Sequence, residues 1–218
     1  MHTKDSLIAQ LSAMLPSDAT VLMHSSCKSL GQMENGGDTI LDALTEYFSR
    51  GLVVLPTHTW ATVNDRQPVY DVLYTPVCIG LLPELFRKRP GVHRSWHPTH
   101  SVAAFGADAE EFVRGDENCP TPCARDSAWG RLYDRDAYVL LVGVELNRMT
   151  FFHGVEEWNG IPGRLKETPN RYVVIPPDGG RIVRDYYPHC GDSSQLYPKA
   201  ETALLHAVSY THLTLPTT

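Results

Sequence analysis

A histidine and a glutamate stand three residues apart after an apolar run, and together they could move a proton. The run Tyr138–Val144 leads into a polar turn at Glu145–Arg148, and Thr150, His153 and Glu156 follow. On a helix, residues three apart share a face. A histidine with a carboxylate nearby is the usual general base, because its ordinary pKa lies near neutrality. The pair therefore indicates either a general base or a structural histidine in a phenylalanine-rich turn.

A second group of chemically capable side chains fills the segment PGVHRSWHPTHSVAAFG, residues 90–106. It contains Arg94 and three histidines, His93, His97 and His100. One interpretation is a metal site, since His97 and His100 could bind one ion. The others are a loop whose histidines pack and hydrogen-bond, and a turn whose amides and small side chains closely approach a nucleotide cofactor. The residues alone leave these three interpretations open.

The polar turn HSSCKSLG, residues 24–31, follows a short apolar run, Thr20–His24. In open α/β sheets, ligands collect at the carboxyl ends of strands, where backbone N–H groups and hydroxyls point outward. The turn lacks both the G-x-G-x-x-G and the G-x-x-x-x-G-K-[ST] pattern. A dinucleotide fold or a P-loop is therefore not expected.

The chain has five cysteines, and they are scattered. This distribution predicts reduced thiols rather than a disulfide framework. Cys119 and Cys123 have a loosely metal-like spacing, but no second pair follows to complete a four-ligand zinc site, so we expect no metal. Cys27 lies in the serine-rich turn without an assigned base and is interpreted as a packing residue rather than a nucleophile.

Helical and strand-like segments alternate along the chain and must position these residues. Helical spacing of apolar residues marks 4–14, 39–49, 80–88, 109–114 and 199–208, and buried-strand runs mark 20–24, 52–56, 101–105 and 138–144. Segments 172–175 and 181–185 flank Pro-Asp-Gly-Gly, which predicts a hairpin. The alternation predicts an α/β fold with a mostly parallel central sheet covered on both faces.

The length of 218 residues suits one domain, which we place at 1–208. The tail 209–218 (SYTHLTLPTT) is rich in threonine and resembles translated adapter sequence. We therefore expect the tail to be non-native or disordered, and the natural C-terminal segment to be missing.

The charge and hydropathy of the chain narrow the class of partner. A net charge of −6 argues against a nucleic-acid partner and would attract a cationic ligand. No apolar run approaches the length of a membrane span, and the first residues do not form a signal segment. We expect a cytoplasmic protein with no membrane contact.

Four blocks, taken in order, resemble the aminoglycoside 3-N-acetyltransferases. They are MHSSCKSLG with GGDTILDAL, then LVVLPTHTW, then LLPELFRKRPGVHRSWHPTHSVAAFG, then LLVGVELNRMTFFHGVEEWNGIP. The segment R-x-P-G-x-x-R-S-x-H-P-x-x-S with the later T-x-x-H-x-x-E is specific as an ordered set. The resemblance covers residues 5–207, nearly everything except the tail.

The resemblance implies a three-layer α/β/α fold of the antibiotic N-acetyltransferase type. It also implies acetyl transfer from acetyl-CoA, with no metal, to the 3-amino group of an aminoglycoside or a related amine, and a role in antibiotic resistance. The partners would be coenzyme A and a small cationic amine, and the protein would be a monomer or a homodimer.

The same resemblance assigns roles to residues. His153 would be the catalytic base, and Glu156 beside it would contact the cationic amino sugar. Residues implied to bind the cofactor are Ser25, Ser26 and Lys28 at the pyrophosphate, Thr57 and Thr59 at the pantetheine and acetyl region, and Arg94, Ser95, His97 and Ser101 in the other cofactor block. Amides or hydroxyls near Thr57 or Ser101 could stabilise the tetrahedral oxyanion. Asp192, in the polar stretch His189–Gln195, is the candidate carboxylate that orients His153.

The chain departs from the family pattern in two places, and two rival functions remain. Ser26 and Cys27 follow the first serine of the opening loop, where the family usually has a leucine. The region before the R-S-x-H-P block is shorter than expected for resistance enzymes, so the acceptor amine stays open. The rivals are a metal-dependent hydrolase using His97, His100 and His153, and a non-catalytic module that binds coenzyme A.

Overall fold

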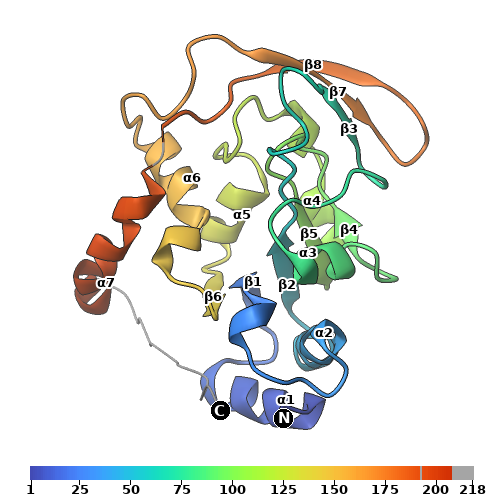
Figure 1. Cartoon of the computed structure of the whole chain (residues 1–218), viewed down its shortest axis with the longest axis vertical. Helices are drawn as coiled ribbons and strands as arrows, with labels where there is room; N and C mark the ends of the chain where they lie inside the picture. The colour runs from blue at the N-terminus through green and yellow to red at the C-terminus, as the bar shows by residue number, and fades with distance from the viewer. Residues whose placement is uncertain (192, 208–218) are drawn as a thin grey trace.

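The central sheet is built from the short apolar runs. The computed structural model, which describes residues 1–191 and 193–207, has five strands in this sheet: β1 (Thr20–Ser25), β2 (Leu52–Pro56), β4 (His93–Arg94), β5 (Val102–Gly106) and β6 (Tyr138–Val142). Their order is β4-β5-β2-β1-β6 (Figure 1). β1 lies parallel to β2 and β6, whereas β5 is antiparallel to β2 and β4. The sheet is therefore mixed, where a mostly parallel one was predicted.

The antiparallel pairing of β4 with β5 follows from a short connection. Only Ser95–Ser101 separates β4 from β5, and parallel neighbours need a crossover of a dozen residues or more. Beyond the end of β2, Thr57 N donates to Ser101 O at 2.7 Å and Thr59 N to Thr99 O at 3.0 Å. A continuous apolar run indicates a buried strand but not its direction, so the run itself did not reveal this reversal.

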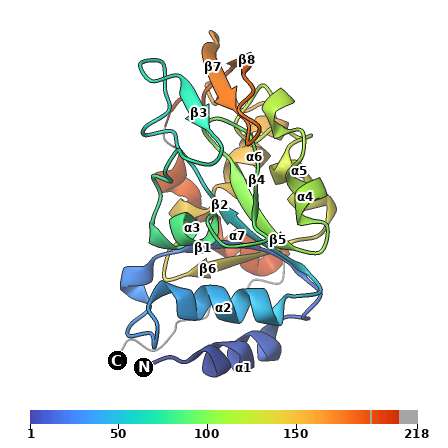
Figure 2. The ribbon, with the colours of Figure 1, turned by 90° about the vertical axis from the view of Figure 1, so that its right-hand side faces the viewer.

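Helices cover both faces of the sheet and give the predicted three layers. On one face α1 (Lys4–Met14), α2 (Gly37–Tyr47) and α3 (Leu81–Phe86) share a core with residues of β1 and β2 such as Val21 and Val53. On the other face α4 (Ala109–Val113), α5 (Ala128–Asp134) and α6 (Phe151–Trp158) pack against Leu22 and Val54. Figure 2 shows α1 and α2 stacked beneath the sheet. The α/β/α layering is confirmed.

A second, smaller sheet lies beyond the first and contains the predicted hairpin. Its strands are β3 (Val69–Asp71), β7 (Asn170–Ile175) and β8 (Ile182–Tyr186), in the order β3-β7-β8 (Figure 1). β7 and β8 are antiparallel around the Pro-Asp-Gly-Gly turn. Tyr70, Tyr172 and Tyr186 are buried together on this sheet.

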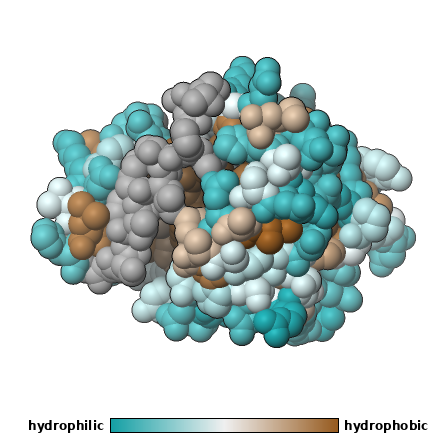
Figure 3. All heavy atoms as spheres, turned by 90° about the horizontal axis from the view of Figure 1, so that it is seen from below, coloured by the Kyte–Doolittle hydropathy of each residue, from teal (hydrophilic) through white to brown (hydrophobic). Residues whose placement is uncertain are grey.

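The remaining elements are short. They are the 3-10 helices η1 (Cys27–Ser29), η2 (Asp116–Asn118), η3 (Leu146–Arg148) and η4 (Ser194–Ala200), and the helix α7 (Glu201–Ala207). The helix predicted over 199–208 thus corresponds to the end of η4 and α7, with position 208 and the tail 209–218 outside the described residues. Within the described ranges, no helix is both long and apolar enough to cross a membrane. Seen from the end where α1 lies, the coloured surface is mostly hydrophilic with scattered hydrophobic areas (Figure 3).

Candidate active site

His153 and Glu156 lie side by side on α6, as their spacing predicts. His153 Nδ1 is 3.2 Å from Glu156 Oε2. Both side chains are mostly buried, with 19% of the His153 side chain and 16% of the Glu156 side chain exposed. The pair is therefore shielded from bulk water yet reachable from one side, as a proton-transfer site needs to be.

The carboxylate of Glu156 is held by residues that follow it in the chain. Ser193 Oγ donates to Glu156 Oε1 at 2.5 Å, and Tyr197 Oη donates to Glu156 Oε2 at 2.8 Å. Arg164 Nη1 lies 3.4 Å from Oε2 and also donates to Ser193 Oγ at 3.2 Å. The Tyr197 hydroxyl also contacts His153 Nδ1. These contacts fix the ring of His153 through its Nδ1 atom.

The surroundings of His153 favour its neutral form. Burial lowers the pKa of His153, and the charge of Arg164 acts in the same direction, while Glu156 partly opposes both. Burial would raise the pKa of Glu156, but hydrogen bonds from Ser193 and Tyr197 outweigh it and hold that pKa below its usual value. The site therefore combines a neutral imidazole with an ionised carboxylate.

His153 stands at one end of a group of buried histidines. The ring centroids of His153 and His189 are 5.2 Å apart, those of His189 and His100 are 4.9 Å apart, and those of His100 and His58 are 4.6 Å apart. Burial lowers the pKa of His189 to about 2 and that of His58 and His100 well below the usual range. The interior around His153 is thus lined with uncharged imidazoles.

The turn after β1 reaches the same end of the sheet. Burial, followed by the charge of His153, lowers the pKa of His24, so these two rings are close enough to interact. Ser25 and Ser26 are half-buried and Lys28 is exposed, and Ser26 N donates to Val142 O at 3.0 Å at the end of β6. Since the chain continues from β6 into α6, the serine-rich turn and His153 lie on the same side of the molecule.

The other residues expected at the cofactor are buried. Thr57, Thr59, Ser95 and Ser101 have no exposed surface, and Arg94 and His97 have very little. Thr57 Oγ1 and Ser101 Oγ are 2.8 Å apart. Arg94 Nη2 donates to Thr57 O at 2.9 Å, and its guanidinium lies 5.1 Å from the centre of the Tyr70 ring.

Several polar atoms of these side chains have hydrogen-bond partners within the protein, whereas His97 Nε2 is buried without one. Ser95 Oγ accepts from Val102 N at 3.1 Å, and Thr59 Oγ1 donates to Pro98 O. His97 Nδ1 accepts from the backbone N–H groups of Thr99 and His100 at 3.3 and 3.0 Å. The structure thus brings the 57–59 and 94–101 residues together where β2 ends and β5 begins. The turn at 25–28 follows β1, the parallel neighbour of β2.

Sequence reasoning missed several residues of the site. Tyr197, Ser193, Arg164 and His189 all come from segments after α6, and only the polar character of the stretch His189–Gln195 pointed there. Asp192, the carboxylate expected to orient His153, lies outside the described residues. Within them, Glu156 occupies the position next to the His153 Nδ1 atom.

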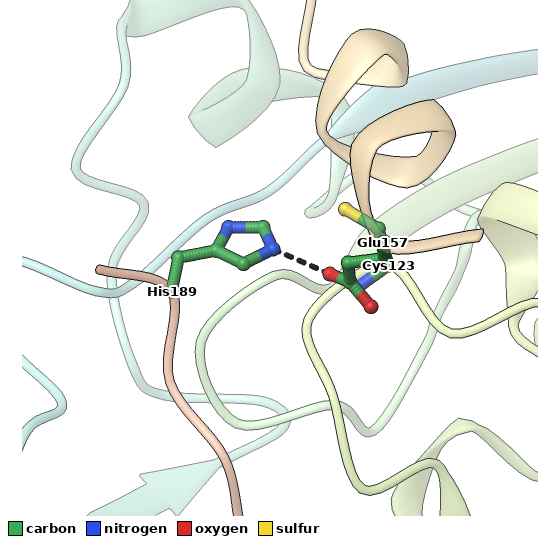
Figure 4. A group of neighbouring side chains, drawn as sticks. All are labelled: Cys123, Glu157 and His189. Carbon is green, nitrogen blue, oxygen red and sulfur yellow. Dashed lines mark hydrogen bonds and ion pairs between the residues drawn. The ribbon is translucent and has the colours of Figure 1, made fainter. Parts of the chain in front are cut away.

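A second cluster adjoins the site at the far end of α6. Figure 4 shows Cys123, Glu157 and His189 facing one another, with His189 Nε2 in contact with Glu157 Oε1. Cys119, which has a loosely metal-like spacing from Cys123 in the sequence, is buried in the same loop but does not belong to this group. Periodicity and spacing gave no sign of this group, because its members come from three separate segments.

Comparison with known proteins gives a consistent result. A family model described as aminoglycoside 3-N-acetyltransferase matches residues 22–215. The SPbeta prophage-derived aminoglycoside N(3')-acetyltransferase-like protein YokD of Bacillus subtilis is 30% identical over 207 residues, covering 85% of this chain and 74% of the relative. Aminoglycoside N(3)-acetyltransferase VII of Streptomyces paromomycinus is 28% identical over 204 residues, covering 85% and 70%.

Solved structures show the same likeness. The crystal structure of YokD from Bacillus subtilis superposes with a TM-score of 0.78 at 28% identity, covering 94% of this chain and 88% of that one. AAC-IIIb in its binary complex with CoASH gives 0.80 at 25% identity, covering 94% and 85%. A histidine-to-alanine variant of aminoglycoside acetyltransferase AAC(3)-IVa in complex with a gentamicin gives 0.77 at 26% identity, covering 94% and 76%.

Proposed function

Because this chain belongs to the aminoglycoside 3-N-acetyltransferase family, we propose that it transfers the acetyl group of acetyl-CoA to the 3-amino group of an aminoglycoside or a related amine. The family match and the named relatives confirm two predictions from the sequence: the family that the four motifs resemble, and the acyltransferase class. The CoASH complex of AAC-IIIb supports acetyl-CoA as the cosubstrate. The gentamicin complex of the AAC(3)-IVa variant supports an aminoglycoside as the acceptor.

His153 is the proposed general base. The contacts of its Nδ1 atom with Glu156 and Tyr197 favour the tautomer that carries its proton on Nδ1, which leaves the lone pair of Nε2 for the substrate. An ammonium group cannot attack a thioester, so Nε2 takes up one proton of the amine. The amine nitrogen then bonds to the acetyl carbon, and the tetrahedral intermediate collapses with breakage of the C–S bond and release of the coenzyme A thiolate.

The cofactor would lie between His153 and the turn after β1. Ser25, Ser26 and Lys28 are the accessible residues of the proposed cofactor set, and a lysine ammonium is suited to a pyrophosphate. The other residues of the proposed cofactor set are buried and would position the cofactor indirectly, by fixing the backbone where β2 ends and β5 begins. They are Thr57, Thr59, Arg94, Ser95, His97 and Ser101. Oxyanion stabilisation near Thr57 or Ser101 stays a prediction, as does contact between Glu156 and the amino sugar.

The single observation that supports this function is the buried His153–Glu156–Tyr197 arrangement at the end of the sheet reached by the β1 turn. The hydrolase alternative is not favoured, because among the described residues His97, His100 and His153 do not form a group of converging metal-ligand atoms. A module that only binds coenzyme A would not need a neutral imidazole held by an ionised carboxylate.

The test is the release of thiol from acetyl-CoA with a panel of aminoglycosides and simple polyamines. His153→Ala should lower turnover by about 100-fold or more while coenzyme A binding is retained. His206→Ala, which removes an exposed histidine of α7, is the matched control and should keep full activity. Unchanged turnover in His153→Ala would exclude the proposed base, and activity with polyamines alone would replace the aminoglycoside as acceptor.

A further inference from the structure

Cys123, Glu157 and His189 bring three different metal-ligand types to one place. A sulfur, a carboxylate oxygen and an imidazole nitrogen from these residues all lie within 4.8 Å of one another (Figure 4). Ligands of a tetrahedral zinc ion stand about 3.5 Å apart, given bond lengths of roughly 2.0–2.3 Å. The three ligand atoms would therefore need only small side-chain movements to reach the spacing of a zinc site.

The three side chains are buried and their backbones are fixed. Cys123 has no exposed surface, and 5% of the Glu157 side chain and 8% of the His189 side chain are exposed. Cys123 N donates to Glu157 Oε1 at 2.8 Å, and the Trp158 indole donates to Cys123 O at 2.8 Å. On the other side, Cys190 N donates to Arg164 O at 2.9 Å. Cys123 in the loop before α5, Glu157 on α6 and His189 after β8 are thus held in place by protein contacts alone.

The charge balance of this cluster favours a cation. Throughout ranges 1–191 and 193–207, no lysine or arginine nitrogen lies within ion-pair distance of Glu157. Its carboxylate contacts the His189 ring, accepts from Cys123 N at 2.8 Å and is hydrogen-bonded by the Thr121 side chain. Such hydrogen bonds offset part of the cost of a buried carboxylate, and an opposite charge beside it would offset more. A divalent ion would supply that charge at the one place where the three ligands converge.

The mixture of ligands selects the kind of ion. Sulfur and imidazole ligands suit zinc-class ions, whereas magnesium and calcium require oxygen ligands. We propose that Cys123, Glu157 and His189 bind one zinc-class divalent ion, with a fourth position left for water. The Cys123 thiol gives up its proton on binding. The ion would join three segments far apart in the sequence and stabilise the folded state by mass action.

Cobalt(II) is the direct probe. After treatment with a chelator, the full chain should bind one cobalt ion with the charge-transfer absorption of a thiolate–cobalt bond, and zinc should displace it. Zinc should also raise the thermal unfolding temperature. Cys123→Ser should abolish the charge-transfer band, and both Cys123→Ser and His189→Gln should weaken zinc binding by more than about 100-fold.

Cys119→Ser is the matched control, since Cys119 is a buried cysteine of the same loop outside the cluster; the band and the affinity should survive. Far-UV circular dichroism establishes that each variant is folded, and His189→Gln tests the site even if Cys123→Ser unfolds. Absence of the band in the wild type, or its survival in Cys123→Ser, would overturn the proposal. Because these readouts do not involve acetyl transfer, they are independent of the proposed function.

Discussion

Both the Tyr197 hydroxyl and the Glu156 carboxylate hold the proton of His153 on its Nδ1 atom. Burial raises the pKa of Tyr197, so its hydroxyl stays protonated, and it donates to Glu156 Oε2 at 2.8 Å. Its oxygen can then accept the Nδ1 proton of His153. This arrangement fixes the imidazole tautomer without a second buried negative charge.

Tyr197→Phe should therefore lower kcat by about 10-fold, the effect of losing one hydrogen bond of roughly 1.4 kcal/mol in the transition state. The KM for acetyl-CoA should change little, because Tyr197 acts through His153. Steady-state kinetics with both substrates measures this division. Tyr74→Phe, at a residue with 79% exposure, is the control, and an unchanged kcat in Tyr197→Phe would exclude the positioning role.

Glu156→Gln tests the electrostatic side of the same contact. Glu156 raises the pKa of His153 against the effect of burial, so removing its charge should lower that pKa further. Protonated His153 cannot accept a proton, and activity therefore falls as pH falls through its pKa. The acidic limb of kcat/KM should move to lower pH, with a reduced plateau. A limb that moves to higher pH would contradict the assignment.

The spacing of His153 and Glu156 predicts a contact only if both lie on one helix, and α6 supplies that helix. Tyr197 and Ser193 could not be predicted in the same way. Tyr197 lies in η4 and Ser193 just before it, so both follow the hairpin β7–β8 in the chain. Their contact with α6 depends on the tertiary fold, which no local sequence periodicity predicts.

At the scale of elements, Arg94 connects β4 to the loop that follows β2. Its guanidinium donates to Thr57 O at 2.9 Å, Thr75 O at 2.8 Å and Val72 O at 3.1 Å. Burial lowers the pKa of Arg94, yet arginine remains charged under ordinary conditions. One planar cation thereby donates to three carbonyl groups, of which Thr57 O also accepts from Ser101 Oγ at 2.8 Å.

Arg94→Lys should reduce the free energy of unfolding by about 2–4 kcal/mol, because an ammonium group cannot reach three carbonyls in a fork. Urea denaturation followed by circular dichroism measures the change. Arg50→Lys, at an exposed arginine that donates to Ser17, should change stability by less than about 0.5 kcal/mol. Equal stability of both variants would show that the Arg94 contacts contribute nothing.

Most strands and helices could be predicted because each carries its own hydrophobic period. β2 matches its predicted run, and β7 and β8 were indicated by their turn. β3, β4, α5 and α6 were not among the predicted segments, since each is too short to show a clear hydrophobic period. The direction of β5 relative to β2 could not be predicted, because a continuous apolar run indicates a buried strand but not its direction.

At the scale of the whole molecule, buried neutral histidines make stability depend on pH. Burial lowers the pKa of His24 and His97 to about 3 and that of His189 to about 2, with His58 and His100 also well below their usual value. In the unfolded chain these groups keep a pKa near 6.5. Below that pH the unfolded state binds protons that the folded state does not bind, so the free energy of unfolding decreases as pH falls.

The free energy of unfolding should be flat above about pH 7 and then decrease on acidification by about 1.4 kcal/mol per pH unit for each such histidine. Asp116, whose pKa burial raises to about 6, offsets part of the loss at more acidic pH because its folded form holds the extra proton. Urea denaturation across this range checks the slope. Stability that is constant or rises on acidification would show that the histidines are not buried and neutral.

The pairing of β1 has a consequence for synthesis. Val21 lies opposite Val53 in β2 and opposite Tyr138 in β6, so one edge of this central strand has no neighbour until β6 emerges from the ribosome. At roughly 5–20 residues per second, the delay is on the order of ten seconds. During that interval we expect the nascent chain to present an apolar strand edge to other chains. The yield of native protein should therefore depend on translation speed and on chaperones that cover this edge.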